Sequence, residues 1–401
     1  MTELASFLGR IRPPSTPVLI IRREALLHNL RTMQKLCDEA GVRLRAHGKM
    51  HKCSALGRLQ MELGAIGLCC QTVGEAEAFV AGGIMDVLVT APVPFWGAAR
   101  LARLANSGAR LSVVVDDENQ VDHLEAAARE SGALLHLLVD VDLGLHRAGC
   151  TPERAPTLAR QIAASSYLRF DGLQAYFGHL QHEADLEKRQ SADAIATERL
   201  KGLVAQLVDD GLRPNVVTGG GTGTYAYDLA AGVFNELQAG SYAVMDVEYA
   251  MCGAPDGGAW LFEPALFIAA SVVSAQHKTH CTSDAGLKAV AVDGPSPHVV
   301  AGAAEGSTWR SMGDEHGAIL DPVFLPDLQR ARDRLDQAAI IERIDRDANA
   351  QSSNPPPRVG DLVWLQPGHC DPTINLYDAF LVADEDGTFG RWDIDARRVM
   401  K

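Results

Sequence analysis

The stretch AIGLCCQTVGEAEAFVAGGIMDVLVT, residues 65–90, contains the repeating unit on which the fold depends. It opens with a short apolar run at 65–70, continues as a stretch of helical spacing at 73–82 and ends in a second apolar run at 86–90. Short apolar runs bounded by turn residues indicate buried strands. A strand, a helix and a second strand in this order predict a parallel pair, because the crossover between parallel strands needs a covering helix.

The same alternation extends in both directions along the chain. We predict eight strands separated by helical stretches, at 42–48, 65–70, 86–90, 110–115, 134–141, 171–176, 214–218 and 243–247. Eight strands within about 210 residues fit a closed, TIM-type (β/α)8 barrel of the α/β class. A doubly wound open sheet is the structural alternative.

Beyond residue 255 the pattern becomes that of antiparallel strands. Apolar runs at 265–276, 287–293, 361–366 and 378–384 are separated mainly by turn residues. Residues 325–357 resemble a charged helical insertion that ends in the linker SSNPPP. We therefore predict a barrel domain over 22–255 and a second, mostly antiparallel β domain formed by 1–21 plus 256–401.

Charge and cysteine content limit the class of function. The 401 residues include 37 Lys and Arg and 51 Asp and Glu, which gives a formal net charge of −14. This argues against nucleic-acid binding, which needs clustered basic residues. We expect no membrane association, because no apolar stretch reaches the roughly 18 residues of a membrane span, and we see no secretory signal. Eight cysteines without a CxxC pair are typical of the reduced thiols of a cytoplasmic enzyme.

The cluster RAHGKMHK, residues 45–52, follows the first predicted barrel strand. Functional groups of such barrels gather at the carboxyl ends of the strands, where Lys49 would stand. Nearby positive charges, among them Arg45 and Lys52, favour the neutral amine that Schiff-base chemistry requires. A solvated basic loop is the simpler interpretation of this cluster alone.

The glycine-rich run VTGGGTGTY, residues 217–225, follows the seventh predicted strand. Consecutive glycines let backbone N–H groups converge on an anion, and threonine hydroxyls add donors. Barrel phosphate sites lie in the loops after strands seven and eight. This position favours a phosphate site over a plain turn, and Gly240, Ser241 and Tyr242 could complete it.

Two further loops carry polar side chains at strand ends. Arg147, in DLGLHRAG at 142–149, could donate a hydrogen bond to an anionic oxygen of a cofactor. The segment YFGHLQH, residues 176–182, offers a ring contact from Tyr176 and a general base among its histidines. Each loop is also compatible with ordinary surface contacts.

The segment PGHCDPT, residues 367–373, lies in the predicted β domain. On an extended segment, residues i and i+2 point the same way, so His369 and Asp371 could share one metal ion. A nitrogen and oxygen pair suits Mn²⁺, Mg²⁺ or Zn²⁺.

Taken together, these segments resemble the family of D-threonine aldolases and D-serine dehydratases, which has the alanine-racemase-like fold. Segments over nearly the whole chain match in order: HGKMHK, GLCCQTVGEAEAF, DVDLGLHRAG, YFGHLQH, TGGGTGTY with ELQAGSY, and PGHCDPTINLYD. Ala46, where the family often has proline, and the insertion at 325–357 depart from the pattern.

The resemblance implies pyridoxal 5'-phosphate as cofactor, with Lys49 as its covalent anchor. It further implies that Arg147 contacts the phenolate oxygen, that Tyr176 lies by the pyridine ring and that His182 is the base acting on the substrate hydroxyl. The remaining cofactor contacts implied are Gln71, Thr218, Gly220, Gly221, Thr222, Gly223, Ser241 and Tyr242. His369 and Asp371 resemble the ligands of a divalent metal, with Mn²⁺ as first choice, and a homodimer is expected.

The resemblance leaves two reactions to be distinguished. Dehydratases of the family resemble one another in carrying His-x-Cys at the metal site, whereas this chain has the His-x-Asp spacing of the aldolases. We therefore expect cleavage of a D-β-hydroxy-α-amino acid to glycine and an aldehyde. The alternative is a dehydratase acting on D-serine or D-3-hydroxyaspartate, which would release ammonia and an oxoacid. A racemase, a non-catalytic cofactor carrier and a metal-only hydrolase each leave part of the set unexplained.

Overall fold

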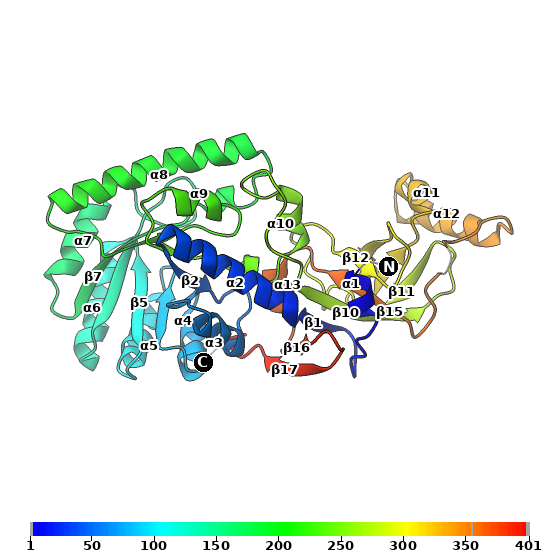
Figure 1. Ribbon diagram of the computed structural model, residues 1–401, viewed down its shortest axis with the longest axis horizontal. Coiled ribbons are helices and arrows are strands. Elements are labelled where there is room, and N and C mark those ends of the chain that lie inside the picture. Colours follow the sequence, from blue (N-terminus) through cyan, green and yellow to red (C-terminus); the bar gives the residue numbers. More distant parts are fainter. Residues whose placement is uncertain (1–2, 354–355, 398–401) are drawn as a thin grey trace. The chain divides into compact units, whose positions relative to one another are not determined.

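The computed structural model describes residues 3–353 and 356–397 (Figure 1). The chain divides into two compact units. One is formed by residues 28–243, 249–262 and 393–397, and the other by 3–27, 244–248 and the described part of 263–392. The expected division at residues 22 and 255 differs from this one at four places: 22–27 and 244–248 belong to the second unit, and 256–262 and 393–397 belong to the first.

Eight parallel strands close a barrel in the first unit, which confirms the predicted TIM-type fold (Figure 1). The strands are β2 (Arg43–His47), β3 (Gly67–Cys70), β4 (Asp86–Val89), β5 (Arg110–Val115), β6 (Leu135–Asp140), β7 (Leu168–Ala175), β8 (Val216–Gly219) and β9 (Glu236–Leu237). The barrel closes where Arg43 of β2 pairs with Glu236 of β9. Five side chains from as many strands fill its interior: Cys69, Leu88, Val114, Leu138 and Val216.

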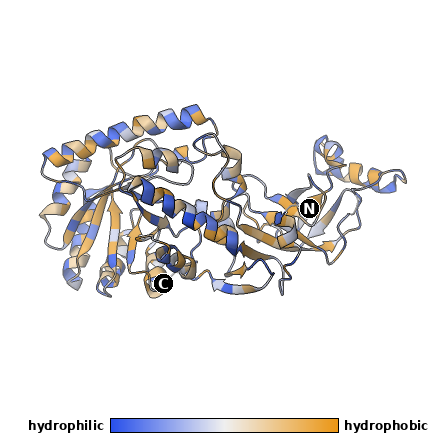
Figure 2. Ribbon diagram, in the orientation of Figure 1, coloured by the Kyte–Doolittle hydropathy of each residue, from blue (hydrophilic) through white to orange (hydrophobic). Residues whose placement is uncertain are grey.

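Helices connect the strands and turn polar positions outward (Figure 2). They are α2 (Arg23–Ala40), α3 (Ser54–Glu62), α4 (Val73–Ala81), α5 (Phe95–Ala105), α6 (Glu118–Ser131), α7 (Ala155–Ala164), α8 (Leu186–Asp209) and α9 (Tyr225–Ala230), with short 3₁₀ turns η1 (Gly178–Leu180) and η2 (Ser241–Ala243). Thr72, Asp117 and Asp185 cap α4, α6 and α8, each accepting a hydrogen bond from a backbone N–H of the first turn. These caps fix where each helix begins after its strand.

The eighth strand is not the one predicted. The apolar run at 243–247 lies between η2 and α10 (Val247–Cys252), and Met245 within it has a left-handed φ of 53°. The barrel is closed instead by the two residues of β9, which are too few to give a periodic pattern. The segment Gly240–Tyr242, which we expected to complete a phosphate site, therefore follows the eighth strand rather than preceding it.

The second unit is built on a sheet of nine strands. In spatial order these are β11 (His280–Ser283), β14 (Gly317–Leu320), β13 (Thr308–Ser311), β12 (His298–Ala301), β15 (Leu362–Gln366), β10 (Leu266–Ser274), β1 (Val18–Arg22), β16 (Ala379–Ala383) and β17 (Phe389–Asp393). β1 pairs antiparallel with β10 and parallel with β16. The pairs β10–β15, β11–β14, β12–β15 and β13–β14 are antiparallel. The expected antiparallel β domain is confirmed.

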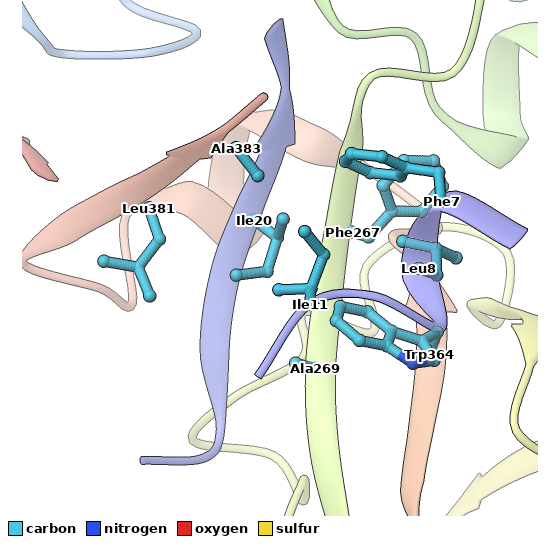
Figure 3. Packing of buried hydrophobic residues seen from close by; sticks show 9 residues of the cluster. All are labelled: Phe7, Leu8, Ile11, Ile20, Phe267, Ala269, Trp364, Leu381 and Ala383. Carbon is cyan, nitrogen blue, oxygen red and sulfur yellow. The ribbon is translucent and has the colours of Figure 1, made fainter. Parts of the chain in front are cut away.

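One face of this sheet holds an apolar core (Figure 3). Ile20 of β1, Phe267 of β10 and Trp364 of β15 pack there. Side chains from α1 (Glu3–Leu8), Phe7 and Leu8, cover them. The amino-terminal segment thus completes the core of a unit whose other strands lie more than 240 residues later in the chain.

Two details of the β domain differ from the sequence prediction. Residues 287–293 form no strand, whereas β11, β12, β13 and β14, of four residues each, and β17, of five, were not predicted. The charged insertion does contain helices, α11 (Leu325–Gln329) and α12 (Arg334–Arg346). Residues 354–355 of the predicted linker lie outside the described residues.

The helices and the cysteines of the described residues bear on the expectations of no membrane span and of reduced thiols. Within residues 3–353 and 356–397, none of the helices combines the length and apolar content needed to cross a bilayer. All eight cysteines are buried free thiols.

Candidate active site

A cavity opens at the carboxyl ends of the barrel strands, within the barrel unit. The cavity and the open space in front of it hold about 560 Å³. Its lining residues are His47, Lys49, Met50, Gln71, Thr90, Arg147, Gln174, Tyr176, Gly220, Gly221, Thr222, Gln238, Gly240, Ser241 and Tyr249. Most of the predicted cofactor residues are thus brought to one place by loops that are far apart in sequence.

Lys49 lies in the turn after β2, where the sequence predicted it. Its backbone N–H donates to Nδ1 of His47 at 3.4 Å, and Nε2 of His47 lies 3.1 Å from the hydroxyl of Thr90. The Gln71 amide also donates to that hydroxyl, at 3.2 Å. Gly48 is required before the lysine, because a Cβ there would lie 2.6 Å from the Phe79 ring. The turn that presents Lys49 is therefore fixed from both sides.

Two of the positive neighbours expected around Lys49 are neutralised by carboxylates. Arg45, on β2, is buried and pairs with Glu236 at 2.8 Å and Asp86 at 2.6 Å. Lys52 pairs with Glu75 at 3.3 Å. The charges of Arg45 and Lys52 are therefore compensated by neighbouring carboxylates, and an effect of these two residues on Lys49 stays a prediction.

The glycine-rich run forms a polar cup with the segment after β9. Gly220, Gly221 and Thr222 line the cavity together with Gly240 and Ser241. Gly220 has a φ of +72°, a conformation that favours glycine. The backbone N–H of Tyr242 donates to the Thr222 hydroxyl at 2.9 Å and joins the two segments. Backbone N–H groups and hydroxyls gathered in this way suit a phosphate group.

Arg147 and Tyr176 come from the loops after β6 and β7. The Arg147 guanidinium lies over the Tyr176 ring, 5.7 Å from its centroid, and both side chains line the cavity. Gly178 allows this arrangement, because a Cβ there would lie 2.6 Å from the tyrosine ring. An aromatic face with an arginine beside it can hold a flat, anionic ring.

A layer of polar side chains lies within the barrel mouth, and sequence reasoning missed it. Gln174 donates to the Asp140 carboxylate at 3.0 Å and to the backbone carbonyl of Thr90 at 3.0 Å. Gln238 donates to Gln174 at 3.1 Å and to the Thr218 hydroxyl at 3.0 Å. The sequence feature that could have indicated Gln174 and Gln238 is that each is a polar residue at or just beyond the end of a strand. Tyr249, also missed, follows the mispredicted eighth strand.

Four of the predicted catalytic and cofactor-binding residues do not line the cavity. Thr218 is bound by Gln238, and the N–H of Gly223 donates to Oε1 of Gln181 at 2.9 Å. The Tyr242 side chain is fully buried, with its hydroxyl 3.4 Å from Nε2 of Gln60. The His182 ring packs edge-on against that of Tyr249, with 4.5 Å between centroids. These residues lie behind or beside the cavity lining.

The predicted metal ligands lie in the β unit. His369 precedes the short helix α13 (Cys370–Ile374), and Asp371 lies in its first turn. The premise of an extended segment is therefore wrong. Nδ1 of His369 lies 2.8 Å from Asp293 and 3.9 Å from Glu248. A carboxylate on one ring nitrogen is the arrangement found behind metal-binding histidines, which use the other nitrogen.

The charges around His369 suit a small divalent cation. Burial raises the pKa of Glu248, His369 counteracts this, and Asp293 and Asp371 add to it. Oxygen-rich sites of this kind suit Mn²⁺ or Mg²⁺. Across residues 3–353 and 356–397, however, no three His, Cys, Asp or Glu side chains are gathered into a metal-ligand set. The protein would supply two ligands, and oxygens of water or substrate would supply the rest.

Comparison with known proteins adds sequence relatives over nearly the whole length. Residues 21–247 match the family described as alanine racemase, N-terminal domain, and residues 265–324 and 326–383 match the putative serine dehydratase domain. The 3-hydroxy-D-aspartate aldolase of Paracoccus denitrificans (strain Pd 1222) is 37% identical over 95% of this chain and 92% of its own. The D-threonine aldolase of an Arthrobacter species is 35% identical over the same shares.

Solved structures agree with these relatives. The D-threonine aldolase of Filomicrobium marinum superposes with a TM-score of 0.84 at 36% identity, over 96% of each chain. The D-threo-3-hydroxyaspartate dehydratase of Delftia sp. HT23 gives a TM-score of 0.78 at 23% identity, over 94% of this chain and 97% of its own. The latter likeness shows a shared fold.

Proposed function

From the premise that the chain belongs to the D-threonine aldolase family and is a carbon–carbon lyase of that type, we propose that it cleaves D-β-hydroxy-α-amino acids into glycine and an aldehyde. D-threonine and D-3-hydroxyaspartate are the proposed substrates, with pyridoxal 5'-phosphate and a divalent metal as cofactors. The observation that supports this most directly is that Lys49, Arg147, Tyr176 and the glycine-rich cup line one cavity.

The lining residues fit pyridoxal phosphate by their chemistry. Lys49 would anchor the cofactor covalently, and the cup formed by Gly220–Thr222 and Ser241 would hold its phosphate. Tyr176 would lie against the ring, and Arg147 would donate to the ring oxygen. When bound, the cofactor supplies an electron-accepting ring that stabilises negative charge at the substrate α-carbon.

The proton on the substrate hydroxyl must leave when the Cα–Cβ bond breaks. We assign its removal to His182, which contacts Tyr249 of the cavity wall. A metal held by His369 and Asp371 would lower the pKa of that hydroxyl. In this proposal His182 is the base and the metal is the Lewis acid. A histidine suits the first role because imidazole accepts protons near neutral pH.

A dehydratase is the second candidate, because residues 265–383 largely match the putative serine dehydratase domain. It would break the bond from Cβ to the hydroxyl oxygen and lead to ammonia and an oxoacid. The sequence His369-Cys370-Asp371 has the spacing that resembles the aldolases. The products therefore distinguish the two reactions.

The test is product analysis with purified protein, added pyridoxal phosphate and Mn²⁺. We expect D-threonine to yield glycine and acetaldehyde, and D-3-hydroxyaspartate to yield glycine and glyoxylate, with L-threonine as the stereochemical control. Borohydride reduction should place a pyridoxyl label on Lys49 in the wild type and in His182→Gln, while only the wild type forms product. Ammonia and an oxoacid as the products would favour the dehydratase, and an unlabelled Lys49 would contradict both.

By the same family resemblance we propose a homodimer. Sedimentation analysis of the purified protein tests this, and a monomer at working concentration would contradict it.

A further inference from the structure

A chain of buried hydrogen bonds runs behind the cavity, through side chains to which the proposed reaction assigns no role. Its members are His51, two residues after Lys49, Gln60 on α3, and Tyr242 on η2. His51 and Tyr242 are 0% exposed and Gln60 is 2% exposed. Polar groups buried this completely need hydrogen-bond partners, and here His51 contacts Gln60, which contacts Tyr242 in turn.

The direction of this chain follows from one backbone group. The N–H of Cys53 donates to Nδ1 of His51 at 3.0 Å, so Nδ1 carries a lone pair and the ring proton is on Nε2. Nε2 lies 3.2 Å from Oε1 of Gln60 and therefore donates to it. The amide of Gln60, with its oxygen occupied, donates through its own Nε2 to the Tyr242 hydroxyl at 3.4 Å. Each group is thus fixed as donor or acceptor, and the chain specifies one arrangement of the three side chains.

The two ends of the chain belong to the two halves of the candidate site. His51 lies in the lysine turn, residues 48–52, and its backbone N–H donates to the carbonyl of Gly48 at 3.2 Å. Tyr242 belongs to the cup, because its backbone N–H donates to the hydroxyl of Thr222, which lines the cavity. A displacement of His51 would therefore move the lysine turn, and a displacement of Tyr242 would move the cup.

The chain connects these halves at the level where a ligand would lie. A backbone hydrogen bond from the N–H of His47 to the carbonyl of Ala239, at 3.0 Å, continues the pairing of β2 with β9. Lys49 and Ser241 lie two residues further along each segment. There a connection between the segments runs through the side chain of Gln60, which is supplied by a third element.

We propose that His51, Gln60 and Tyr242 are positioning residues that hold the lysine turn and the cup at a fixed separation, matched to a ligand bound at both ends. This rests on the proposed function, in which pyridoxal phosphate bonds to Lys49 through its aldehyde and to the cup through its phosphate. Two contacts on one rigid molecule reinforce each other only when they are held at the right distance. The three side chains are not among those that line the cavity in the described structure, so they would act without touching the ligand.

The experiment compares three ligands on the full-length apoprotein. Pyridoxal phosphate engages both halves of the site, pyridoxal has the aldehyde without the phosphate, and pyridoxamine phosphate has the phosphate without an aldehyde to bond Lys49. Tyr242→Phe removes one hydroxyl and keeps the ring that packs against Phe262. We expect its dissociation constant for pyridoxal phosphate to rise by roughly tenfold, as the loss of a buried hydrogen bond implies, while those for the two half-ligands stay at wild-type values.

Further variants separate positioning from direct contact. Gln60→Met keeps the approximate size of the side chain, removes both hydrogen bonds and should give the same selective loss. His51→Gln, whose amide can donate to Gln60, should retain more affinity for pyridoxal phosphate than His51→Leu, which cannot donate. The matched control is Gln34→Met, at another buried glutamine, whose amide bonds Asp38 of its own helix α2 at 2.8 Å. It should leave all three dissociation constants unchanged.

Three results would overturn the proposal. An equal loss for all three ligands would show that the variants damage the site as a whole. A loss in Tyr242→Phe that pyridoxamine phosphate shares and pyridoxal does not would make the hydroxyl a direct phosphate contact. Wild-type affinity for pyridoxal phosphate in both Tyr242→Phe and Gln60→Met would show that the chain does not position the cup.

A spectroscopic readout tests the chain without a ligand. In the apoprotein isotope-labelled at its histidine ring nitrogens, nuclear magnetic resonance should find the proton of His51 on Nε2, and Gln60→Met should shift that signal whereas Gln34→Met should not. A proton on Nδ1 would contradict the chain itself. Failure of the wild type to bind pyridoxal phosphate and label Lys49 would instead contradict the proposed function, so the two failures are distinguishable.

Discussion

Asp140 lies in the barrel mouth, and we expect its protonation to change the free energy of unfolding. It is 8% exposed, and its carboxylate accepts a hydrogen bond from Gln174. Burial raises the pKa of Asp140 to about 7, the Gln174 bond counteracts this, and Asp116 adds to it. The unfolded chain would release this proton near pH 4. The folded protein therefore binds more protons between about pH 4 and pH 7.

We predict that the contribution of Asp140 to wild-type stability falls as pH rises through this interval and then levels off, because rising pH favours the state that binds fewer protons, which for this group is the unfolded state. Asp140→Asn keeps an acceptor for Gln174 and removes the titration. Its free energy of unfolding relative to the wild type should rise by a few kcal/mol from pH 5 to pH 8, since one pH unit corresponds to about 1.4 kcal/mol. Urea unfolding at the two pH values measures this.

The control for this prediction is Asp117→Asn, which keeps a capping side chain at the start of α6. Its stability relative to the wild type should be the same at both pH values. An equal difference at pH 5 and pH 8 for Asp140→Asn would show that Asp140 is already ionised in the folded protein.

At the scale of an element, two glycines differ in whether a side chain would fit. Gly223 lies in the loop between β8 and α9, and Gly202 lies in the helix α8. A Cβ at Gly223 would lie 2.0 Å from the backbone carbonyl oxygen of Gln181, so alanine there must displace the loop. A Cβ at Gly202, exposed on α8, would meet nothing within 4 Å. The first glycine is required by packing, whereas the second only weakens a helix.

We predict that Gly223→Ala weakens pyridoxal phosphate binding by roughly ten- to hundredfold, the equivalent of about 1–3 kcal/mol of loop strain. Gly202→Ala should instead raise stability by about 0.5–1 kcal/mol and leave affinity unchanged. Cofactor titration and thermal unfolding of both variants provide the measurements. Wild-type affinity in Gly223→Ala would mean that the loop accommodates a side chain without moving the cup.

The elements also show which parts of the fold a sequence pattern can reveal. Strands such as β5 and β6, with six residues each, produced clear apolar runs and were predicted at nearly their observed positions. β9 has two residues, too few for periodicity to distinguish it from a loop, and β11–β14, which lie outside the alternation of strands and helices, were also missed, whereas β3, β4 and β8 of the same four-residue length were predicted within that alternation. The missed strands are therefore those stabilised by their neighbours rather than by their own pattern.

The site follows the same division. Lys49 and the glycine-rich run were predicted because their composition is unusual and they follow predicted strands. Gln174 and Gln238 are ordinary residues at strand ends, and only the closure of the barrel brings them together beneath the cavity.

At the scale of the whole molecule, the residues of the two proposed cofactors come from different compact units. The cup and Lys49 belong to the barrel unit, whereas His369 and Asp371 belong to the β unit. This separation allows the contribution of the metal to be measured while the pyridoxal site is monitored by its own absorbance.

We predict that chelation, or His369→Ala, abolishes cleavage of D-threonine while the visible absorbance of bound pyridoxal phosphate and its dissociation constant remain at wild-type values. The physical reason is that the substrate hydroxyl, without a cation to lower its pKa, would not release its proton near neutral pH. Re-addition of Mn²⁺, Mg²⁺ or Zn²⁺ should restore the chelated wild type but not His369→Ala. His298→Ala, which removes an exposed histidine of β12 in the same unit, is the matched control and should retain activity. Full activity in metal-free protein, or loss of pyridoxal phosphate together with the metal, would contradict the assignment of separate roles to the two sites.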